Sequence, residues 1–332
     1  MNNPSIDDVA DAAGVHRSTV SRAFSKPEAV RAETREHVLR IAADLGYSMS
    51  PVARALRSKS SRLVPLIVPD ITNPFFSELA RTTAAAAETR GYHVILCITN
   101  GDSDQTAGYL SAMHAMYSPF GVVAPSTKVD LDALARYGVA NRIVVLDRVE
   151  DDPAIPTVTV DSGEGIELAL EHLMSLGHRA IAYAPGIVGT YTAQDRWDAY
   201  RRTALVHGLS PTILQPEPGH EVSTGIVDQW LQHDPRPSAI IASNDLIAFA
   251  LISELGSRGI AVPQEVSIIG FDGLDFGARF NPRLTSVRQP ITDMGRIAIE
   301  LGEKLISGEQ SDHVVLRPTL LLRSSTQEPL DD

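Results

Sequence analysis

Arg17, Ser18 and Arg22 have the residue types and the spacing to bind a patterned array of hydrogen-bonding groups. They lie in the stretch VHRSTVSRAF, residues 15–24, where a helix would turn them to one side. The guanidinium of arginine offers donors in a fixed fork, and a serine hydroxyl can donate or accept. In the major groove of DNA, guanine O6 and N7 accept from arginine, and other base edges suit a hydroxyl. The stretch is therefore a candidate for reading bases.

A second set of polar residues follows apolar runs later in the chain, each where a strand would end. Examples are Asp147 with Arg148 after RIVVL, and Asp272 after SIIGF. Ligands bind beyond the carboxyl ends of parallel strands, and this mixture suits the hydroxyls and apolar face of a sugar-like or nucleoside-like molecule. The alternative is that each aspartate only caps the next helix. The set comprises Asp70, Phe75, Ser126, Asp147, Arg148, Thr190, Thr192, Asn244, Asp245, Phe271 and Asp272.

Three short helices are predicted in residues 1–47, and they would position the N-terminal set. Ser5 and Asp8 have the spacing of a helix N-cap with an acidic first turn, and Gly14 follows as a stop. Further helices are expected from Arg17 and over 32–45. Two helices joined by a tight glycine-containing turn form a helix-turn-helix, whose second helix can enter the major groove. A solvated three-helix bundle is the alternative. The second helix would turn Val20, Ala23 and Phe24 inward and leave Arg17, Ser18, Ser21 and Arg22 outward.

The stretch SMSPVARALRSKSSR, residues 48–62, predicts a short hinge helix and linker. Ser50 is a good N-cap and Pro51 suits the first helical position, but two turns are marginal for a helix alone in water. Basic residues such as Arg54 accompany one large apolar side chain, Leu56. This combination suits a helix in the minor groove whose leucine wedges between base pairs. A Ser/Lys linker that contains a leucine by chance is the alternative.

From Leu63 the chain alternates strand-like apolar runs with helical patterns, which predicts an α/β core of two parallel-sheet units over 63–332. We expect an N-subdomain of about 63–160 with 293–323, and a C-subdomain of about 161–292. The runs LTSVRQP and VVLRPTLLLR flank the last helix and would let the chain cross between the units. The lone cysteine, Cys97, lies in the apolar run YHVILCI and is predicted to be a buried core thiol.

The distribution of charge confines nucleic-acid binding to the N-terminus. The formal net charge is −12, but residues 1–62 carry 10 Lys and Arg against 7 Asp and Glu. No apolar run approaches the about 20 residues of a membrane helix, and the N-terminal stretch lacks the pattern of an export signal, so a cytoplasmic protein without membrane contact is expected. Motifs of nucleotide loops, serine hydrolases and zinc sites are absent, which argues against an enzyme and predicts neither a cofactor nor a metal.

The segments IDDVADAAGV, STVSRAF, ETREHVLRIAADLGY, ARALRS and DITNPFF together resemble the LacI/GalR family of transcriptional regulators, and the resemblance runs the length of the chain. It implies a DNA-binding headpiece, a hinge helix and a core like that of periplasmic binding proteins. It also implies that Arg17, Ser18 and Arg22 read the major groove and that Leu56 wedges the central step of a palindromic operator. The DNA-binding candidates are Ser5, His16, Arg17, Ser18, Ser21, Arg22, Thr34, Arg54 and Leu56.

The same resemblance implies an effector pocket in the core. Phe75 and Phe76 match the pair of aromatic residues that lines this pocket in the family. Arg196 in DRWDAY matches the pocket arginine, and Asp272 in GFDG matches the pocket aspartate. His220 stands where the family often has a stacking aromatic residue, which argues against a simple hexose. The effector-binding candidates are Phe75, Phe76, Ser126, Asp147, Arg148, Thr190, Thr192, Arg196, His220, Asn244 and Asp272.

Helix caps depart from the family's pattern at three places. His16 replaces the Ser or Thr that usually precedes the recognition helix, so either the cap is weaker or the imidazole joins the DNA contacts. Arg31 stands where a capping serine is common before the third helix. Met49-Ser50-Pro51 replaces the usual Pro-Asn pair, and we expect the hinge helix to survive because serine caps nearly as well as asparagine.

These patterns predict a homodimeric repressor whose DNA affinity depends on a small polar effector. Two headpieces would bind the half-sites of a palindrome, and closure of the cleft would set the spacing at which the hinge helices form. The segment TQEPLDD has no heptad repeat for a tetramer bundle, so a dimer is expected. A ligand carrier of the periplasmic type shares the core and is the main alternative, but it would not need the first 60 residues.

Overall fold

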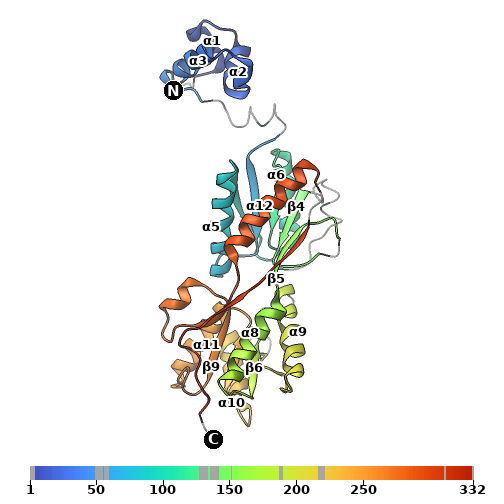
Figure 1. Cartoon of the computed structure of the whole chain (residues 1–332). Coiled ribbons are helices and arrows are strands. Elements are labelled where there is room, and N and C mark those ends of the chain that lie inside the picture. The colour runs from blue at the N-terminus through green and yellow to red at the C-terminus, as the bar shows by residue number, and fades with distance from the viewer. Residues whose placement is uncertain are drawn as a thin grey trace. The chain divides into compact units, whose positions relative to one another are not determined.

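The computed structural model describes residues 4–48, 55, 60–126, 134, 142–150, 152–186, 190–215, 221–309 and 312–330 (Figure 1). The chain divides into two compact units. The first is Met1–Arg62 with Ala115–Pro119, and the second is Leu63–His114 with Phe120–Asp332. Most of the predicted hinge helix, including Arg54 and Leu56, lies outside the described residues.

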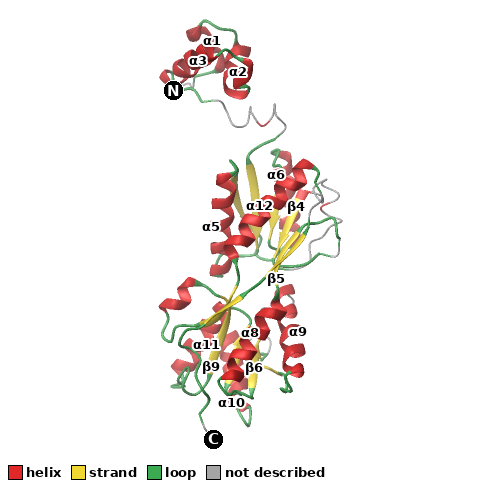
Figure 2. Ribbon diagram, viewed as in Figure 1, coloured by secondary structure: helices red, strands yellow, loops and turns green. Residues whose placement is uncertain are grey.

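The first unit contains the helix-turn-helix that the sequence predicts (Figure 2). Its helices are α1 (Ile6–Ala13), α2 (Arg17–Ser25) and α3 (Ala32–Asp44), with a 3₁₀ turn, η1 (Pro27–Ala29), between the last two. Small apolar side chains from all three helices meet in one cluster, and Phe24 packs edge to face on Tyr47 with ring centroids 5.8 Å apart. The buried members of the cluster are Val9, Ala10, Ala13, Val20, Ala23, Val38 and Ala42.

The second unit is built on two sheets, of which the first is entirely parallel. Its strand order is β11-β5-β4-β3-β1-β2. Each strand runs in the same direction as its neighbour, as expected for strands linked through helices. The strands are β1 (Leu63–Val68), β2 (His93–Ile98), β3 (Gly121–Val123), β4 (Ile143–Leu146), β5 (Thr157–Val160) and β11 (His313–Leu316), with helices α5 (Pro74–Thr89), α6 (Ser103–Ala115) and α12 (Ile291–Ser307).

The second sheet has the order β12-β10-β9-β8-β6-β7, in which only β12 runs antiparallel to its neighbour. Its central strands are buried along their whole length and consist mostly of apolar residues, as expected for strands covered on both faces. The strands are β6 (Ile181–Ala184), β7 (Thr212–Ile213), β8 (Ala239–Ala242), β9 (Ser267–Asp272), β10 (Thr285–Arg288) and β12 (Thr319–Leu321). The helices are α8 (Ser162–Ser175), α9 (Tyr191–Val206), α10 (Val222–Gln232) and α11 (Asp245–Ser257), with the 3₁₀ turn η3 (Asp275–Arg279).

The chain passes between the two sheets three times, after β5, after β10 and after β11 (Figure 1). Helix α12 returns to the first sheet and packs against α5, where Arg90 forms ion pairs with Glu300 and Glu303. The expectation that 293–323 belongs to the N-subdomain is wrong at its end, because β12 pairs with β10 of the second sheet. The run VVLRPTLLLR contains two strands separated by Arg317-Pro318, and each joins a different sheet.

One local expectation is confirmed in the core. Cys97 is buried on β2, at 6% exposure, and burial raises the pKa of its thiol. Within the part of the chain that the structure describes, no helix is long and apolar enough to cross a bilayer.

Candidate functional site

A capping box holds the start of α1. The Ser5 backbone N–H donates to Asp8 Oδ2 at 2.6 Å, and the Asp8 N–H donates to Ser5 Oγ at 3.2 Å. These bonds hold the pKa of Asp8 below its ordinary value. Gly14 ends the helix at φ 64°, a left-handed conformation that glycine adopts without strain. The predicted cap is confirmed, and the Ser5 hydroxyl is engaged within it.

Helix α2 is capped by a histidine. The Ser18 backbone N–H donates to His16 Nδ1 at 3.2 Å, and Ser18 Oγ lies 2.8 Å from the same nitrogen. The imidazole thus supplies the acceptor that a serine or threonine usually provides at an N-cap. The ring itself thus caps the helix, and a DNA contact of His16 stays a prediction.

Four residues of α2 were predicted to face outward, but not all of them are exposed. Arg22 is exposed, and Arg17 is exposed in an ion pair with Asp7 at 3.6 Å. Ser18 is half-buried at the start of the helix. Ser21 was expected outward and that prediction is wrong, because its exposure is 7%. It lies about 60° around the helix from Phe24, at the border of the apolar side.

The third helix contributes Thr34, which is half-buried in its first turn. Its N-cap, Arg31, makes no side-chain capping bond, in agreement with the departure seen in the sequence. On α2, Arg17 and Arg22 are exposed and can donate hydrogen bonds to nucleic acid.

In the core, a buried arginine and a buried carboxylate meet at the carboxyl end of the second sheet. Arg196, in the second turn of α9, is 6% exposed, and its Nη1 donates to the Ser243 carbonyl at 2.7 Å. The same nitrogen lies 3.8 Å from Asp272 Oδ1, and the guanidinium stacks 3.8 Å from the centroid of the Phe271 ring. The aromatic ring and the carboxylate hold the charged group in one orientation.

Asp272 ends β9 in an unusual backbone conformation, with φ 129° and 2% exposure. Gln289 Nε2 donates to its Oδ1 at 2.7 Å. Among the described residues, three buried polar atoms of this cluster have no hydrogen-bond partner: Asp272 Oδ2, Arg196 Nε and Gln289 Oε1. Because such atoms cost free energy unless they are satisfied, two acceptors and one donor are available for a ligand.

Burial dominates the electrostatics of this site. It raises the pKa of Asp272 well above the ordinary value, and the nearby Arg196 charge offsets only part of the effect. It also raises the pKa of Asp147 to about 6, again against the charge of Arg196. A bound group that donates hydrogen bonds would favour the ionised form of both carboxylates.

The first sheet contributes Asp147 and Arg148, which follow β4. Asp147 has φ 63°, and Arg148 is 6% exposed. Arg148 Nε lies 2.8 Å from Glu150 Oε1 in a buried ion pair, and the guanidinium lies 4.9 Å from the centroid of the Tyr191 ring at the start of α9. Residues of the two sheets therefore meet here, which is also seen where the Tyr191 N–H donates to the Ser126 carbonyl at 3.3 Å.

The remaining effector candidates have diverse surroundings. Phe75 is buried in the apolar core at 2% exposure, and half-buried Phe76 packs edge to face on it. Asn244 caps α11 by accepting from the Ile247 N–H at 2.8 Å, so its side-chain oxygen serves the helix. Thr190 caps α9 by position, and Thr192 lies in the first turn of that helix. His220 lies outside the described residues.

A pocket of about 280 Å³ opens beside Asp272 and Gln289. Its wall also includes Glu78 from α5 and Phe276 from η3. Ligand-sized space therefore borders Asp272 and Gln289, two residues of the buried cluster.

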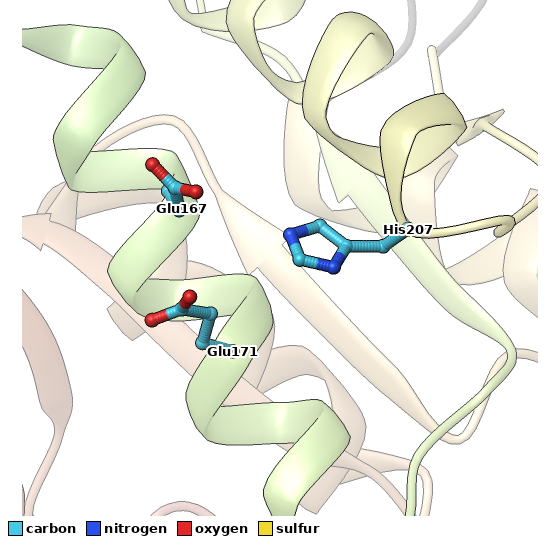
Figure 3. Close-up of side chains that lie close together, drawn as sticks. All are labelled: Glu167, Glu171 and His207. Carbon is cyan, nitrogen blue, oxygen red and sulfur yellow. The ribbon is translucent and has the colours of Figure 1, made fainter.

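Three exposed side chains on the second sheet's helices could hold a cation. Glu167 and Glu171 are one turn apart on α8, and His207 follows α9 (Figure 3). One ligand atom from each lies within 4.8 Å of the others. All three are exposed, as polar residues on a helix surface usually are.

Two residues of the site were not found from the sequence. Gln289 follows the strand β10 and Asp272 is the last residue of β9, and their contact arises only because these strands are neighbours. Glu150 is buried beside Arg148. The sequence indicates only that each residue lies shortly after a strand-like run, and many loop residues share that position.

Comparison with known proteins gives the same two parts. Residues 5–60 match the model of bacterial regulatory proteins, lacI family, and residues 170–326 match the periplasmic binding protein-like domain. The ribose operon repressor of Halalkalibacterium halodurans is 33% identical over 307 residues, which cover 92% of each chain. The chain belongs to the LacI family of bacterial regulatory proteins. As a LacI-family regulator, it combines a DNA-binding helix-turn-helix with an effector-binding core.

Solved structures of LacI-family proteins share this fold. The lac repressor dimer bound to operator and an anti-inducer has a TM-score of 0.87 at 22% identity, covering 98% of this chain and 100% of that one. A LacI-family regulator from Enterococcus faecium with bound ribose has a TM-score of 0.71 at 27% identity, covering 80% of this chain and 99% of that one.

Proposed function

We propose that this LacI-family regulator is a homodimeric repressor with a headpiece of 1–47, a hinge of 48–62 and an effector core of 63–332. The observation that carries the proposal is the start of α2, where a side-chain cap fixes the helix while Arg17 and Arg22 stay exposed. Such a helix can enter the major groove, and paired headpieces suit a palindrome. The operator-bound dimer of the lac repressor supports the same assembly.

The effector is a small sugar with neighbouring hydroxyl groups, and ribose is the first compound to test. Asp272 Oδ2 and Gln289 Oε1 can accept from hydroxyls, while Arg196 Nε can donate to one. The relatives named for the ribose operon and solved with ribose support this choice. A nucleoside offers the same ribose hydroxyls and is the second candidate.

The effector acts by joining the two subdomains. Asp147 and Arg148 follow a strand of the first sheet, whereas Arg196 and Asp272 belong to the second. A ligand that touches both favours the closed arrangement of the core by its differential affinity. Closure changes the spacing of the two hinge segments in the dimer, so effector binding and DNA binding are coupled reciprocally.

Selection from random duplex DNA tests the DNA part of this proposal. Purified protein is incubated with the pool, with and without ribose, and the bound DNA is sequenced. We expect a palindrome with half-sites about one helical turn apart. Arg17→Ala/Arg22→Ala should lose the selected sequence and keep effector binding. Binding that stays weak, salt-sensitive and independent of sequence under all conditions would refute the proposal.

Removal of residues 1–60 distinguishes a regulator from a carrier. A regulator should keep effector binding and lose DNA binding, whereas a carrier would keep its whole function. The headpiece favours the regulator. We also propose a cytoplasmic protein that catalyses no reaction and needs no cofactor, which the transcription-regulator relatives and the lack of catalytic motifs in the sequence support.

A further inference from the structure

The contact between His16 and Ser18 selects one tautomer of the neutral imidazole. A backbone N–H can only donate, so the Ser18 N–H, 3.2 Å from His16 Nδ1, requires a lone pair on that nitrogen. In neutral histidine one ring nitrogen carries hydrogen and the other accepts. The cap therefore selects the tautomer with hydrogen on Nε2.

That tautomer also fixes the Ser18 hydroxyl. Ser18 Oγ lies 2.8 Å from the same Nδ1, and because the nitrogen has no hydrogen, the hydroxyl must be the donor. If the hydroxyl hydrogen turned away to another acceptor, lone pairs on Oγ and Nδ1 would face each other at that distance. A serine hydroxyl normally rotates to donate or accept, but here only its two acceptor lone pairs remain available.

Ser18 is the second residue of α2 and is partly exposed there. The N-terminal residues of a recognition helix are those that reach base edges. In the major groove, adenine N6 and cytosine N4 are amino donors, whereas thymine O4 and guanine O6 are keto acceptors. An acceptor at this place can bond only the amino bases.

We propose that His16 makes Ser18 an obligate acceptor, so that one position of each half-site is read as adenine or cytosine against guanine or thymine on the contacted strand. Each base pair has one amino and one keto base at these sites, so Ser18 reads the orientation of the pair rather than its identity. The proposal rests on the proposed role of α2 in the major groove. It makes His16 a positioning residue for specificity.

The test is selection from random duplexes by the full-length protein and four variants, Ser18→Ala, His16→Ala, His16→Asn and Arg22→Ala. Ser18→Ala identifies the position that Ser18 reads, since only there should selectivity change. The wild type should prefer amino over keto bases at that position by about ten-fold, the loss expected when a hydrogen bond is replaced by two facing acceptors. His16→Ala, which leaves the hydroxyl free to rotate, should reduce the preference to less than about two-fold.

His16→Asn is the matched control. Asparagine is among the best N-caps, and its side-chain oxygen can accept from both the Ser18 N–H and the hydroxyl. This variant should keep the amino preference. In the other three variants, unchanged selectivity at the positions lost in Arg22→Ala shows that the headpiece is folded and docked.

The outcomes separate the two proposals. If no protein selects a palindrome, the proposed function fails and the inference falls with it. A palindrome whose Ser18-dependent position favours keto bases or neither class overturns the inference alone, as does one without any Ser18-dependent position. If His16→Ala weakens binding equally for all bases and keeps the amino preference, His16 is only a cap and the inference is likewise wrong.

Discussion

At the residue scale, Arg196 is the side chain on which effector binding should depend most. It is held by the Ser243 carbonyl, Asp272 and the Phe271 ring, and one of its nitrogens remains open for a ligand. Arg196→Ala should weaken effector affinity by at least about 100-fold, because it removes a charged donor and leaves Asp272 buried without its partner. Binding of DNA without effector should change little. Calorimetry with ribose and operator titrations measure the two effects.

Arg201→Ala provides the control for Arg196. Arg201 lies on the same helix, pairs with Asp198 and has a side-chain exposure of 56%. Its loss should leave both affinities within about two-fold, since exposed ion pairs contribute little. An equal effect of the two substitutions would show that the helix, and not the Arg196 contact, carries the response.

Single residues were predictable where their contacts are local. The Ser5 and Asp8 cap follows from a three-residue spacing, and the cap is formed as expected. Ser21 was misplaced because a small polar residue at the border of an apolar face gives no signal of its burial. The pairing of Gln289 with Asp272 could not be derived, since it depends on which strands become neighbours.

At the element scale, the segment after β12 is held to the second sheet by a buried histidine. His178 is 1% exposed, and its ring nitrogens lie 2.7 Å from Ser238 Oγ, 3.2 Å from Ser267 Oγ and 2.8 Å from the Gln327 carbonyl. Burial lowers the pKa of His178, and the neighbouring His172 adds to the effect. The unfolded chain therefore binds a proton at higher pH than the folded protein does.

The free energy of unfolding should thus fall as the pH drops through about 6.5, where unfolded histidine is protonated. Above that pH the contribution is fully present. In urea unfolding at pH 7.5 and 5.5, His178→Asn should be less stable by about 2 kcal/mol at the higher pH and should lose less on acidification than the wild type. The exposed His207→Asn variant should behave like the wild type. A wild-type stability that rises on acidification would contradict this account.

The predicted hinge helix provides a second test at the scale of single elements. Leu56 lies outside the described residues, but its expected wedge between base pairs predicts that Leu56→Ala weakens operator binding by about ten-fold or more. Effector affinity should remain unchanged, because the effector-binding candidates belong to the core and not to the hinge. Fluorescence anisotropy with operator DNA and calorimetry with effector measure the two quantities. Equal losses in both would rule out the hinge mechanism.

Most elements follow from sequence patterns, whereas their assembly does not. The alternation of strands and helices predicted two parallel sheets, and both are present. The assignment of β12 to the first sheet was wrong because a strand-like run shows that a segment is extended and says nothing of its partner. The partner is set by the crossing after β11, which is a property of the whole chain.

At the scale of the whole molecule, effector binding should release protons. Burial raises the pKa of Asp147 to about 6 and that of Asp272 well above its ordinary value. Ligand hydroxyls that donate to these carboxylates favour ionisation and lower both pKa values. Affinity for ribose should therefore fall as the pH drops below about 6. Calorimetry in buffers of different ionisation enthalpy should show net proton release, and Asp147→Asn should reduce it. Proton uptake on binding would contradict the assignment.

The third crossing also affects how the protein can be made. Strand β11 completes the first sheet beside β5, yet it is separated from β5 by all the residues that form β6 to β10. During synthesis from the N-terminus, the edge of β5 therefore stays open until the ribosome has passed residue 316. An open edge can pair with another chain, so nascent chains and fragments truncated before β11 are exposed to misassembly from the synthesis of β5 until that of β11. The strands of each sheet come from separate segments of the chain, so neither sheet can be expressed from one continuous segment of the gene.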